Sequence, residues 1–540
     1  MHFCGCTHKE SKSSIKLSSN KKTLTSLNAI WVLAFLFLGI LGKPQIKQPY
    51  ELYFDEDQTK PKVKGEFIDG FEEGEWKFYY ESGKLKEISN YENGFLHGEV
   101  KMFFENGKLS SVGYFNYGKQ DSIFKMYYPT GKIKLIGYFN EDEKDSLWSY
   151  FFPDSILWKK FYYKNGKEYL IQFNSNTGEK QVSNGNGKRI EYYESNAIKH
   201  SIPYQDSLKQ GLANYYFKEG VLQKTGNYFK GEKTGNWKSY YPNQKLFKNE
   251  NYAEDTLNGE YFEFFSSGKV SISGYYIKGQ RDSLWKWFLP EGTKKMEGKF
   301  KDDEQHGLWT YYHENGKEES EGLFYKGKKQ GEWQFWYPDG QLWRRGGYIN
   351  DNKEGFWQTF FESGQKLQEG NYLQNKPNGL WKSWYENGKP KDQGSYTEGK
   401  MDGEWKGWFS NGKLNYSGTL QDDLKQDLWE FYYDSGKMRE KGTYKNGMKD
   451  GSWVYYFPSG KIEREGNYKE ENKEGKWLFY YEFGSVQRED NYKENRLNGS
   501  STMFYPNGKV MVEAKYANGL PTGKWKFYDD SGNLTNERSF

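Results

Sequence analysis

The feature that most constrains this chain is a tryptophan that returns every 24 residues. Numbered as position zero, it defines 15 units that run without insertion from residue 189 to residue 540. Four earlier units include Trp76 and Trp148. The two blocks are out of phase because one unit, near residues 172–188, has lost seven residues. Periods of this length are typical of arrays in which each unit packs only against its neighbours.

Other columns of the repeat are at least as regular as the tryptophan. All 19 units carry an aromatic residue at position three, 18 carry one at position fifteen, and 16 carry Gly at position seven. This Gly closes a three-residue turn such as Pro338-Asp339-Gly340, which predicts a type I turn with a G1 bulge. We therefore expect one β-hairpin per unit, with a Gly- or Asn-rich turn leading to the next hairpin.

These columns predict the fold class. We expect an all-β protein, an elongated single-layer antiparallel sheet of tandem 24-residue hairpins, with some 38 strands at two for each of the 19 units. The composition agrees, because 35% hydrophobic and 19% aromatic residues exclude both a disordered chain and a large aliphatic core. The rings are expected to cover backbone instead of filling a deep interior.

Strand alternation predicts which positions share a face. The turn pairs position four with position eight, so position three lies opposite position nine. Positions three, nine, thirteen and fifteen are then expected on one face, and the tryptophan with positions four and eight on the other. Position thirteen is often Gly, as in Gly322, Gly346 and Gly370, which would leave room for a neighbouring ring.

One apolar segment precedes the repeats. Residues 23–42 carry no charge, five lysines lie before them, and the length fits either a membrane anchor or a signal peptide. The positive-inside rule places the repeats outside the cytoplasm, in the periplasm or at the cell surface, or secreted if the segment is cleaved. The expected organisation is a basic cytoplasmic tail at 1–25, a signal-anchor or signal peptide at 26–42, a linker and partial cap at 43–64, a first repeat block at 65–171, a degenerate unit at 172–188 and a second block at 189–540.

The repeat resembles MORN repeats, and more closely their bacterial variant, the YwqK-type family. The resemblance rests on runs such as Gly235-Asn236-Trp237 with Tyr240 and Tyr241, and Gly394-Ser395-Tyr396 with Gly399. It implies a single-layer sheet of hairpins. It also implies a function as a scaffold or membrane-tethering piece, and the YwqK-type family carries an antitoxin-like label.

Composition and motifs limit the chemistry that the chain can perform. The chain has 78 basic and 74 acidic side chains, and because five lysines and one glutamate fall in residues 1–25, the remainder carries 73 of each. A neutral body gives no bulk attraction to nucleic acid. The repeats hold few histidines and no Gly-x-Ser-x-Gly turn, and they leave no room for a catalytic domain. We therefore expect a protein that is not an enzyme and has no cofactor or metal.

Three functions remain open. The first is a membrane-anchored scaffold that presents a surface to a protein partner. The second is binding of a cell-wall polysaccharide or exopolysaccharide by a stripe of indoles, which two strands per unit would space by about 10 Å. The third is antitoxin-like binding of a cognate toxin. The candidate ligand-binding residues are the nine consecutive tryptophans at position zero: Trp285, Trp309, Trp333, Trp357, Trp381, Trp405, Trp429, Trp453 and Trp477.

Overall fold

The structure is a computed structural model that describes residues 45–540. The expected tail at 1–25 and the expected anchor at 26–42 lie outside the described residues. Residues 45–540 form 44 antiparallel β-strands in an open sheet and no helix. Within the same residues, no helix exists that could cross a membrane. The prediction of an all-β antiparallel sheet is therefore confirmed.

The strand bounds follow the repeat closely. The strands are β1 Lys47–Tyr53, β2 Pro61–Ile68, β3 Phe71–Tyr79, β4 Leu85–Glu92, β5 Phe95–Leu96, β6 Gly98–Phe103, β7 Leu109–Asn116, β8 Lys119–Tyr127, β9 Ile133–Asn140, β10 Glu143–Phe151, β11 Leu157–Lys164, β12 Lys167–Asn174, β13 Lys180–Ser183, β14 Asn186–Tyr192, β15 Ile198–Gln205, β16 Leu208–Lys209, β17 Gly211–Tyr216, β18 Leu222–Phe229, β19 Glu232–Tyr240, β20 Leu246–Ala253, β21 Thr256–Phe264 and β22 Val270–Ile277. They continue as β23 Gln280–Phe288, β24 Lys294–Lys301, β25 Glu304–Tyr312, β26 Glu318–Tyr325, β27 Lys328–Trp336, β28 Leu342–Ile349, β29 Asn352–Phe360, β30 Lys366–Leu373, β31 Lys376–Trp384, β32 Pro390–Thr397, β33 Lys400–Trp408, β34 Leu414–Gln421, β35 Leu424–Tyr432, β36 Met438–Lys445, β37 Met448–Tyr456, β38 Ile462–Lys469, β39 Asn472–Tyr480, β40 Val486–Lys493, β41 Arg496–Phe504, β42 Val510–Ala517, β43 Leu520–Tyr528 and β44 Leu534–Ser539.

The strand number exceeds the expected 38 for two reasons. The chain before Trp76 forms the hairpin β1–β2, and the degenerate unit still forms β12 and β13. In addition, two strands are interrupted, which separates β5 from β6 and β16 from β17. The degenerate unit is irregular, since β13 has only four residues and shares only two pairs with each neighbour.

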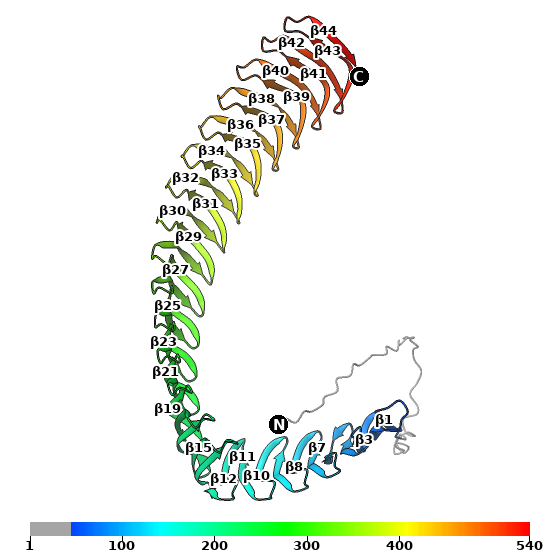
Figure 1. The fold of residues 1–540 in the computed structure, drawn as a ribbon, viewed down its shortest axis with the longest axis vertical. Coiled ribbons are helices and arrows are strands. Elements are labelled where there is room, and N and C mark those ends of the chain that lie inside the picture. The colour runs from blue at the N-terminus through cyan, green and yellow to red at the C-terminus, as the bar shows by residue number, and fades with distance from the viewer. Residues whose placement is uncertain (1–44) are drawn as a thin grey trace, which may run out of the picture. The chain divides into compact units, whose positions relative to one another are not determined.

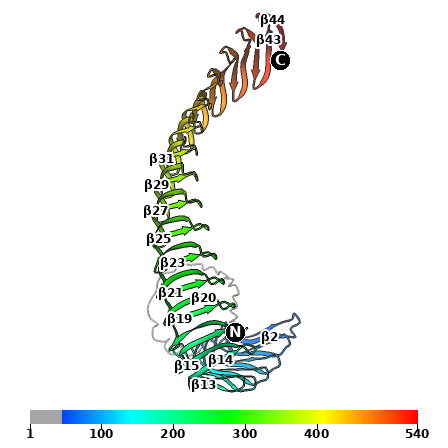
Figure 2. The ribbon, with the colours of Figure 1, turned by 60° about the vertical axis from the view of Figure 1, so that its left-hand side comes forward.

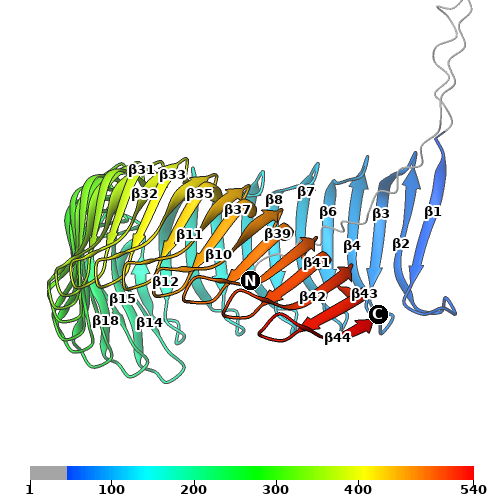
Figure 3. The same cartoon turned by 90° about the horizontal axis from the view of Figure 1, so that it is seen from above.

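The described chain divides into two units. The first comprises the described residues up to Leu157 together with Tyr162–Lys167. The second comprises Trp158–Phe161 and Glu168–Phe540. Within the first unit, β1 to β10 lie side by side in a single layer (Figure 3). Within the second, β19 to β44 follow one another in chain order, each paired with the next (Figure 1). The strand direction turns steadily along this second row (Figure 2), as expected for a twisted sheet.

The hairpin turns have the predicted geometry. In one unit the main-chain N–H of Tyr241 donates to the carbonyl of Lys245 at 2.8 Å, and the N–H of Gln244 donates to the carbonyl of Tyr241 at 2.9 Å. The residue at position seven is left-handed, with φ of 94° at Gly340 and 64° at Gln244, which explains why most units place Gly there. The three-residue loop is therefore confirmed.

The expected assignment of faces is wrong in part. Position three does pair with position nine, as Phe288 pairs with Lys294. However, Trp285 pairs directly with Gly298, so positions zero and thirteen share a face. The cause is a register shift between positions two and three, which inserts an extra residue on the second strand. Such a shift exchanges the faces of the residues beyond it.

We name the two faces of the sheet by the residues that they carry. The tryptophan face carries positions zero, two, eleven, thirteen and fifteen, as shown by the pairs Trp285 with Gly298 and Trp287 with Met296, and by the packing of Phe300. The reverse face carries the residue before the tryptophan and position fourteen, as in the pair Leu308 with Leu323.

Candidate functional site

Nearly every indole at position zero lies flat on a glycine of the preceding unit. A β-carbon placed on Gly298 would lie 2.1 Å from Cδ2, 2.4 Å from Cε2 and 2.4 Å from Cγ of Trp309. Three near-equal distances to ring atoms mean that the ring covers the glycine face-on. The indole Nε1 also donates to the carbonyl of Lys299 at 3.0 Å, which fixes the orientation of the ring. The expectation that rings cover backbone is therefore confirmed.

The outer face of most indoles is covered by a lysine four residues before the tryptophan. The Nζ of Lys329 lies 4.2 Å from the ring centre of Trp333, and that of Lys449 lies 3.9 Å from the ring centre of Trp453. Burial among the rings lowers the pKa of both lysines. The ammonium groups nevertheless gain a cation–π contact with the rings below them.

Aromatic residues at positions two and fifteen complete the packing. Trp333 lies between Tyr311 and Phe335, with ring centres 6.5 and 6.0 Å away, and Phe324 meets it edge-on at 5.2 Å. Neighbouring rings thus exclude water from a face that no second layer of the described chain covers. The same burial raises the pKa of tyrosines at position fifteen, to about 12 for Tyr252.

The nine tryptophans predicted to bind a ligand therefore lie together on one face, but they are mostly covered. Eight of them are at most 7% exposed: Trp285, Trp309, Trp333, Trp357, Trp405, Trp429, Trp453 and Trp477. Trp381 is half-buried. Ligand binding by these residues stays a prediction, and their burial directs attention to the place where the covering is missing.

The aromatic column at position two is interrupted in three successive units. Phe335 and Phe431 stand at this position on either side, but Thr359, Ser383 and Gly407 stand between them. The buried aromatic clusters reflect the gap, since one ends at Trp357 and the next begins at Trp405. The lysine column is interrupted as well, because Pro377 and Met401 take the positions four residues before Trp381 and Trp405.

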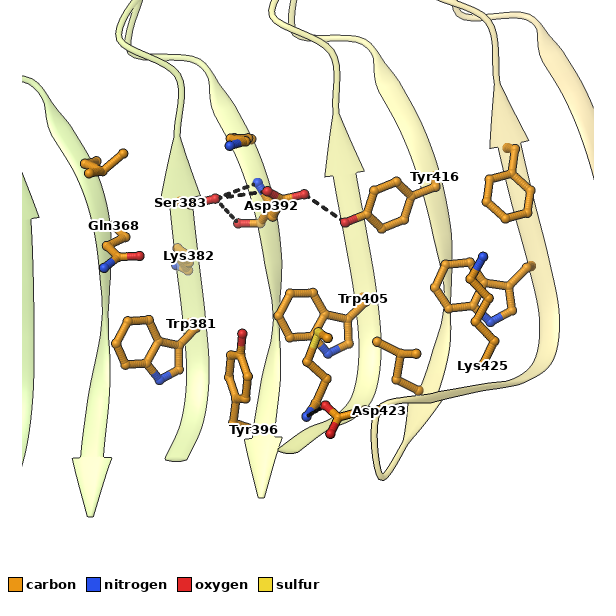
Figure 4. A pocket seen from close by; sticks show the side chains of 16 residues that line it. Gln368, Trp381, Lys382, Ser383, Asp392, Tyr396, Trp405, Tyr416, Asp423 and Lys425 are labelled. Atoms are coloured by element: carbon orange, nitrogen blue, oxygen red, sulfur yellow. Dashed lines mark hydrogen bonds between the residues drawn. The ribbon is translucent and has the colours of Figure 1, made fainter. Parts of the chain in front are cut away.

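The interruption leaves a hollow of about 640 Å³ on the tryptophan face, bordered by Trp381, Trp405, Ser383, Asp392 and Gln368. Figure 4 shows Ser383, Asp392 and Tyr416 in a row beside the two indoles. Tyr416 donates from its hydroxyl to Asp392 Oδ1 at 2.8 Å, and Ser383 Oγ donates to Asp392 Oδ2 at 3.3 Å. The carboxylate is thus held in place, and each of its oxygens keeps a further lone pair for a ligand.

Neither the hollow nor its polar residues followed from the tryptophan column. The signal that could have found them is the position-two column, in which three small residues replace rings. Strand alternation places position two on the same face as the tryptophan, and the register shift brings positions eleven, thirteen and fifteen to that face as well. The predicted assignment of faces did not include position two.

The reverse face carries an exposed apolar row. It follows the residue before the tryptophan and position fourteen across ten strands, from β22 to β31. Leu308 pairs with Leu323 in this row, and their exposed fractions are 50% and 45%. The large apolar members, all exposed, are Tyr275, Leu284, Leu308, Leu323, Phe356 and Leu380. We call this set the reverse-face row.

Comparison with solved structures gives weak similarities only. The crystal structure of TcdB2-TccC3-Cdc42 is 10% identical with a TM-score of 0.12, over 91% of this chain and 30% of that chain. A Photorhabdus luminescens Tc holotoxin pore is 10% identical with a TM-score of 0.13, over 91% of this chain and 29% of that chain. The chain thus spans about 30% of the length of those chains, and TM-scores this low carry no argument. No curated protein matches the sequence.

Comparison with protein families agrees with the hairpin repeat. The family described as MORN repeat variant matches twelve segments, which are residues 72–93, 96–117, 120–141, 305–326, 329–350, 377–398, 401–422, 428–446, 449–470, 473–494, 497–518 and 521–540. Each segment begins near the start of a first strand and extends past the second strand of the same hairpin. Twelve segments of this chain are therefore MORN repeat variants.

Proposed function

We propose that the protein is a non-catalytic scaffold whose repeat sheet binds a protein partner. The observation that supports this function is the reverse-face row, in which six exposed apolar side chains lie on the face opposite the packed rings. Single exposed apolar residues are ordinary on any surface. Six of them in register within ten adjacent strands are a different feature, because together they form one extended contact line.

The size of the row fits a protein interface. Ten adjacent strands span about 43 Å at about 4.8 Å per strand, which is enough for the ~800 Å² that each partner contributes to an interface of standard size. The row is interrupted by Lys299, Glu332, Gly347 and Asn371, and three of these side chains can give polar contacts beside the apolar ones. Burial of the leucines against a partner would stabilise the complex by about 25 cal/mol per Å² of apolar surface.

The test is affinity purification from cell envelopes with cross-linking and mass spectrometry. In the variant Leu308→Glu with Leu323→Glu, we expect at least a tenfold loss of the recovered partner, because two charges would enter the contact line. The matched control is Leu428→Glu, which changes an equally exposed leucine of the same repeat position outside the row. Equal recovery with both variants would contradict the proposal.

We also propose that residues 26–42 anchor the scaffold, with the repeats outside the cytoplasm. The proposal is supported by the uncharged apolar segment and the lysines before it. Digestion of the repeats by protease added to intact spheroplasts is the expected result, and full protection would contradict it. Antitoxin-like binding stays a prediction, to be tested by co-expression with neighbouring genes.

A further inference from the structure

At the hollow beside Trp381 and Trp405, both the ring at position two and the lysine four residues before the tryptophan are missing. We propose that the hollow binds a neutral glycan, with one sugar ring stacked on the outer face of Trp381 and its hydroxyl groups bonded to Asp392, Gln368 and Ser383. This site lies on the tryptophan face and is independent of the reverse-face row. Ligand binding is thus placed at one pocket instead of along all nine tryptophans.

The stacking surface follows from what is missing around Trp381. Its inner face is covered by Gly370, whose β-carbon would lie 2.2 Å from Cδ2 of the ring. Its outer face lacks the lysine found in other units, because Pro377 stands there. Thr359 and Ser383 also leave it without a position-two ring on either side. A flat, rigid indole with one open face suits the apolar C–H face of a sugar, since the ring face is electron-rich.

The polar residues of the hollow supply both kinds of hydrogen-bonding group. Asp392 can only accept, and the Gln368 amide can donate and accept. The Ser383 hydroxyl already donates to Asp392 and accepts from its N–H, so it keeps one lone pair to accept from a ligand. Neighbouring hydroxyl groups of a sugar also donate and accept, so they match this set. Gln368 and Asp392 both stand at position eleven in successive units, which places them along the same side of the indoles.

The charge of the hollow favours a neutral ligand. Its lining includes the carboxylates of Asp392 and Asp423 and the lysines Lys382, Lys391 and Lys425. The Nζ of Lys425 lies over the rings of Trp429 and Phe431 at 4.7 and 4.9 Å. An ammonium ligand would be attracted by the carboxylates and the rings, but Lys425 at the border would repel it. An anionic ligand would meet the two aspartates. Because two carboxylates and three ammonium groups border the hollow, a charged ligand of either sign would meet like charge, and a polyhydroxy ligand would not.

The spacing extends the site along a chain of sugars. Trp381 and Trp405 are one repeat apart, and two strands of about 4.8 Å place them about 10 Å from each other, near the length of a disaccharide. Met401 packs against the cluster that contains Trp405. Its flexible side chain can adapt to a ligand more easily than a lysine held over an indole. We therefore expect a linear oligosaccharide to bind better than a single sugar.

The test is isothermal titration of the full chain with cellohexaose, chitohexaose, laminarihexaose and maltohexaose, and with choline as the cationic probe. We expect saturable binding of at least one oligosaccharide and none of choline. Ser383→Phe introduces at position two the residue that other units carry there, as Phe335, Phe431 and Phe479. The new ring should fill the hollow. It is expected to weaken binding at least tenfold while the unfolding temperature stays equal or rises.

Three further variants separate the site from general stability. Asp392→Asn keeps the shape of the side chain and should weaken binding at least tenfold. Trp525→Ala is the matched control for Trp381→Ala, because Trp525 is also only half-buried at position zero but lies far along the array from the hollow. Trp525→Ala should leave binding unchanged. Choline binding in place of sugar, no saturable oligosaccharide binding, or binding unaffected by Ser383→Phe would each overturn the proposal.

Discussion

At the scale of single residues, the array depends on a size match between position zero and position thirteen of the preceding unit. Where the indole is present, the partner is almost always Gly. Where Ser501 replaces it, the partner is Asp490, and the two buried side chains form a hydrogen bond of 2.7 Å. Where Val100 replaces it, the partner is Ser89. The glycine is thus set by contact with the ring, and its conformation there is ordinary.

The variant Gly298→Ala tests this size match. The new methyl group would lie 2.1 Å from Cδ2 of Trp309, so the indole must move off the sheet. We expect a loss of about 1–3 kcal/mol in the free energy of unfolding, the usual effect of overpacking. Urea unfolding, combined with hydrogen exchange in β24 and β25, measures the loss.

A graded control is available on the same chain. At Gly113 the nearest atom of the facing ring, Cδ2 of Phe124, lies 3.1 Å from the added carbon, so a small shift suffices. Gly113→Ala should therefore cost clearly less than Gly298→Ala. If the two variants were equally stable, contact with the ring would not be what selects glycine.

At the scale of the hairpin, the turns between units use two chemistries. Some have Gly second, as in Lys326-Gly327, and others have an acid or amide, as in Asn350-Asp351. Both are left-handed, with φ of 73° at Gly327 and 70° at Asp351. The acid adds a bond, because the N–H of Lys329 donates to Asp351 Oδ1 at 2.8 Å. The side chain thereby ties one turn to the previous hairpin.

A pair of substitutions at Asp351 separates these two contributions. Asp351→Gly and Asp351→Ala both remove the carboxylate that accepts from Lys329, but only alanine pays the steric cost of a left-handed backbone. We expect the alanine variant to be about 1–2 kcal/mol less stable than the glycine variant. Thermal unfolding of the two proteins side by side gives the difference. Equal stability would mean that the turn relaxes to another conformation.

At the scale of the whole molecule, each hairpin contacts the hairpins next to it in the sequence. Strand pairing in the second unit runs only between consecutive strands from β18 to β44, and nearly every indole at position zero packs on a glycine one unit back. Stability in such an array is the sum of local terms and nearest-neighbour terms. Damage to one unit should therefore remain close to that unit.

Trp453→Ala tests how far damage spreads. Trp453 is 0% exposed, and its removal is expected to cost about 3–5 kcal/mol locally. Hydrogen exchange should accelerate in β35 to β39 and stay unchanged in β19 to β25. Faster exchange throughout the second unit would show instead that the array unfolds as one cooperative body.

Most of the fold was predictable from the sequence because its signals are local. The 24-residue period, the three-residue turns and the room left by Gly322, Gly346 and Gly370 each depend on residues close in the chain or one repeat apart. Left-handed turn positions, and positions that must leave room for a ring, each restrict the residue type directly. Both therefore appear as columns of one residue type in the repeat. The same regularity explains why the strand order could be predicted.

The assignment of faces and the candidate site depended on the tertiary structure. A single register shift between positions two and three decided that Trp285 shares a face with Gly298, and no residue type marks such a shift uniquely. The hollow arises where Ser383 stands in place of a ring between Trp381 and Trp405, whereas the ring of Tyr416 fills the space at Gly407. The sequence by itself determined the hairpins, and only their register in space decided which side chains cover an indole and which leave one open.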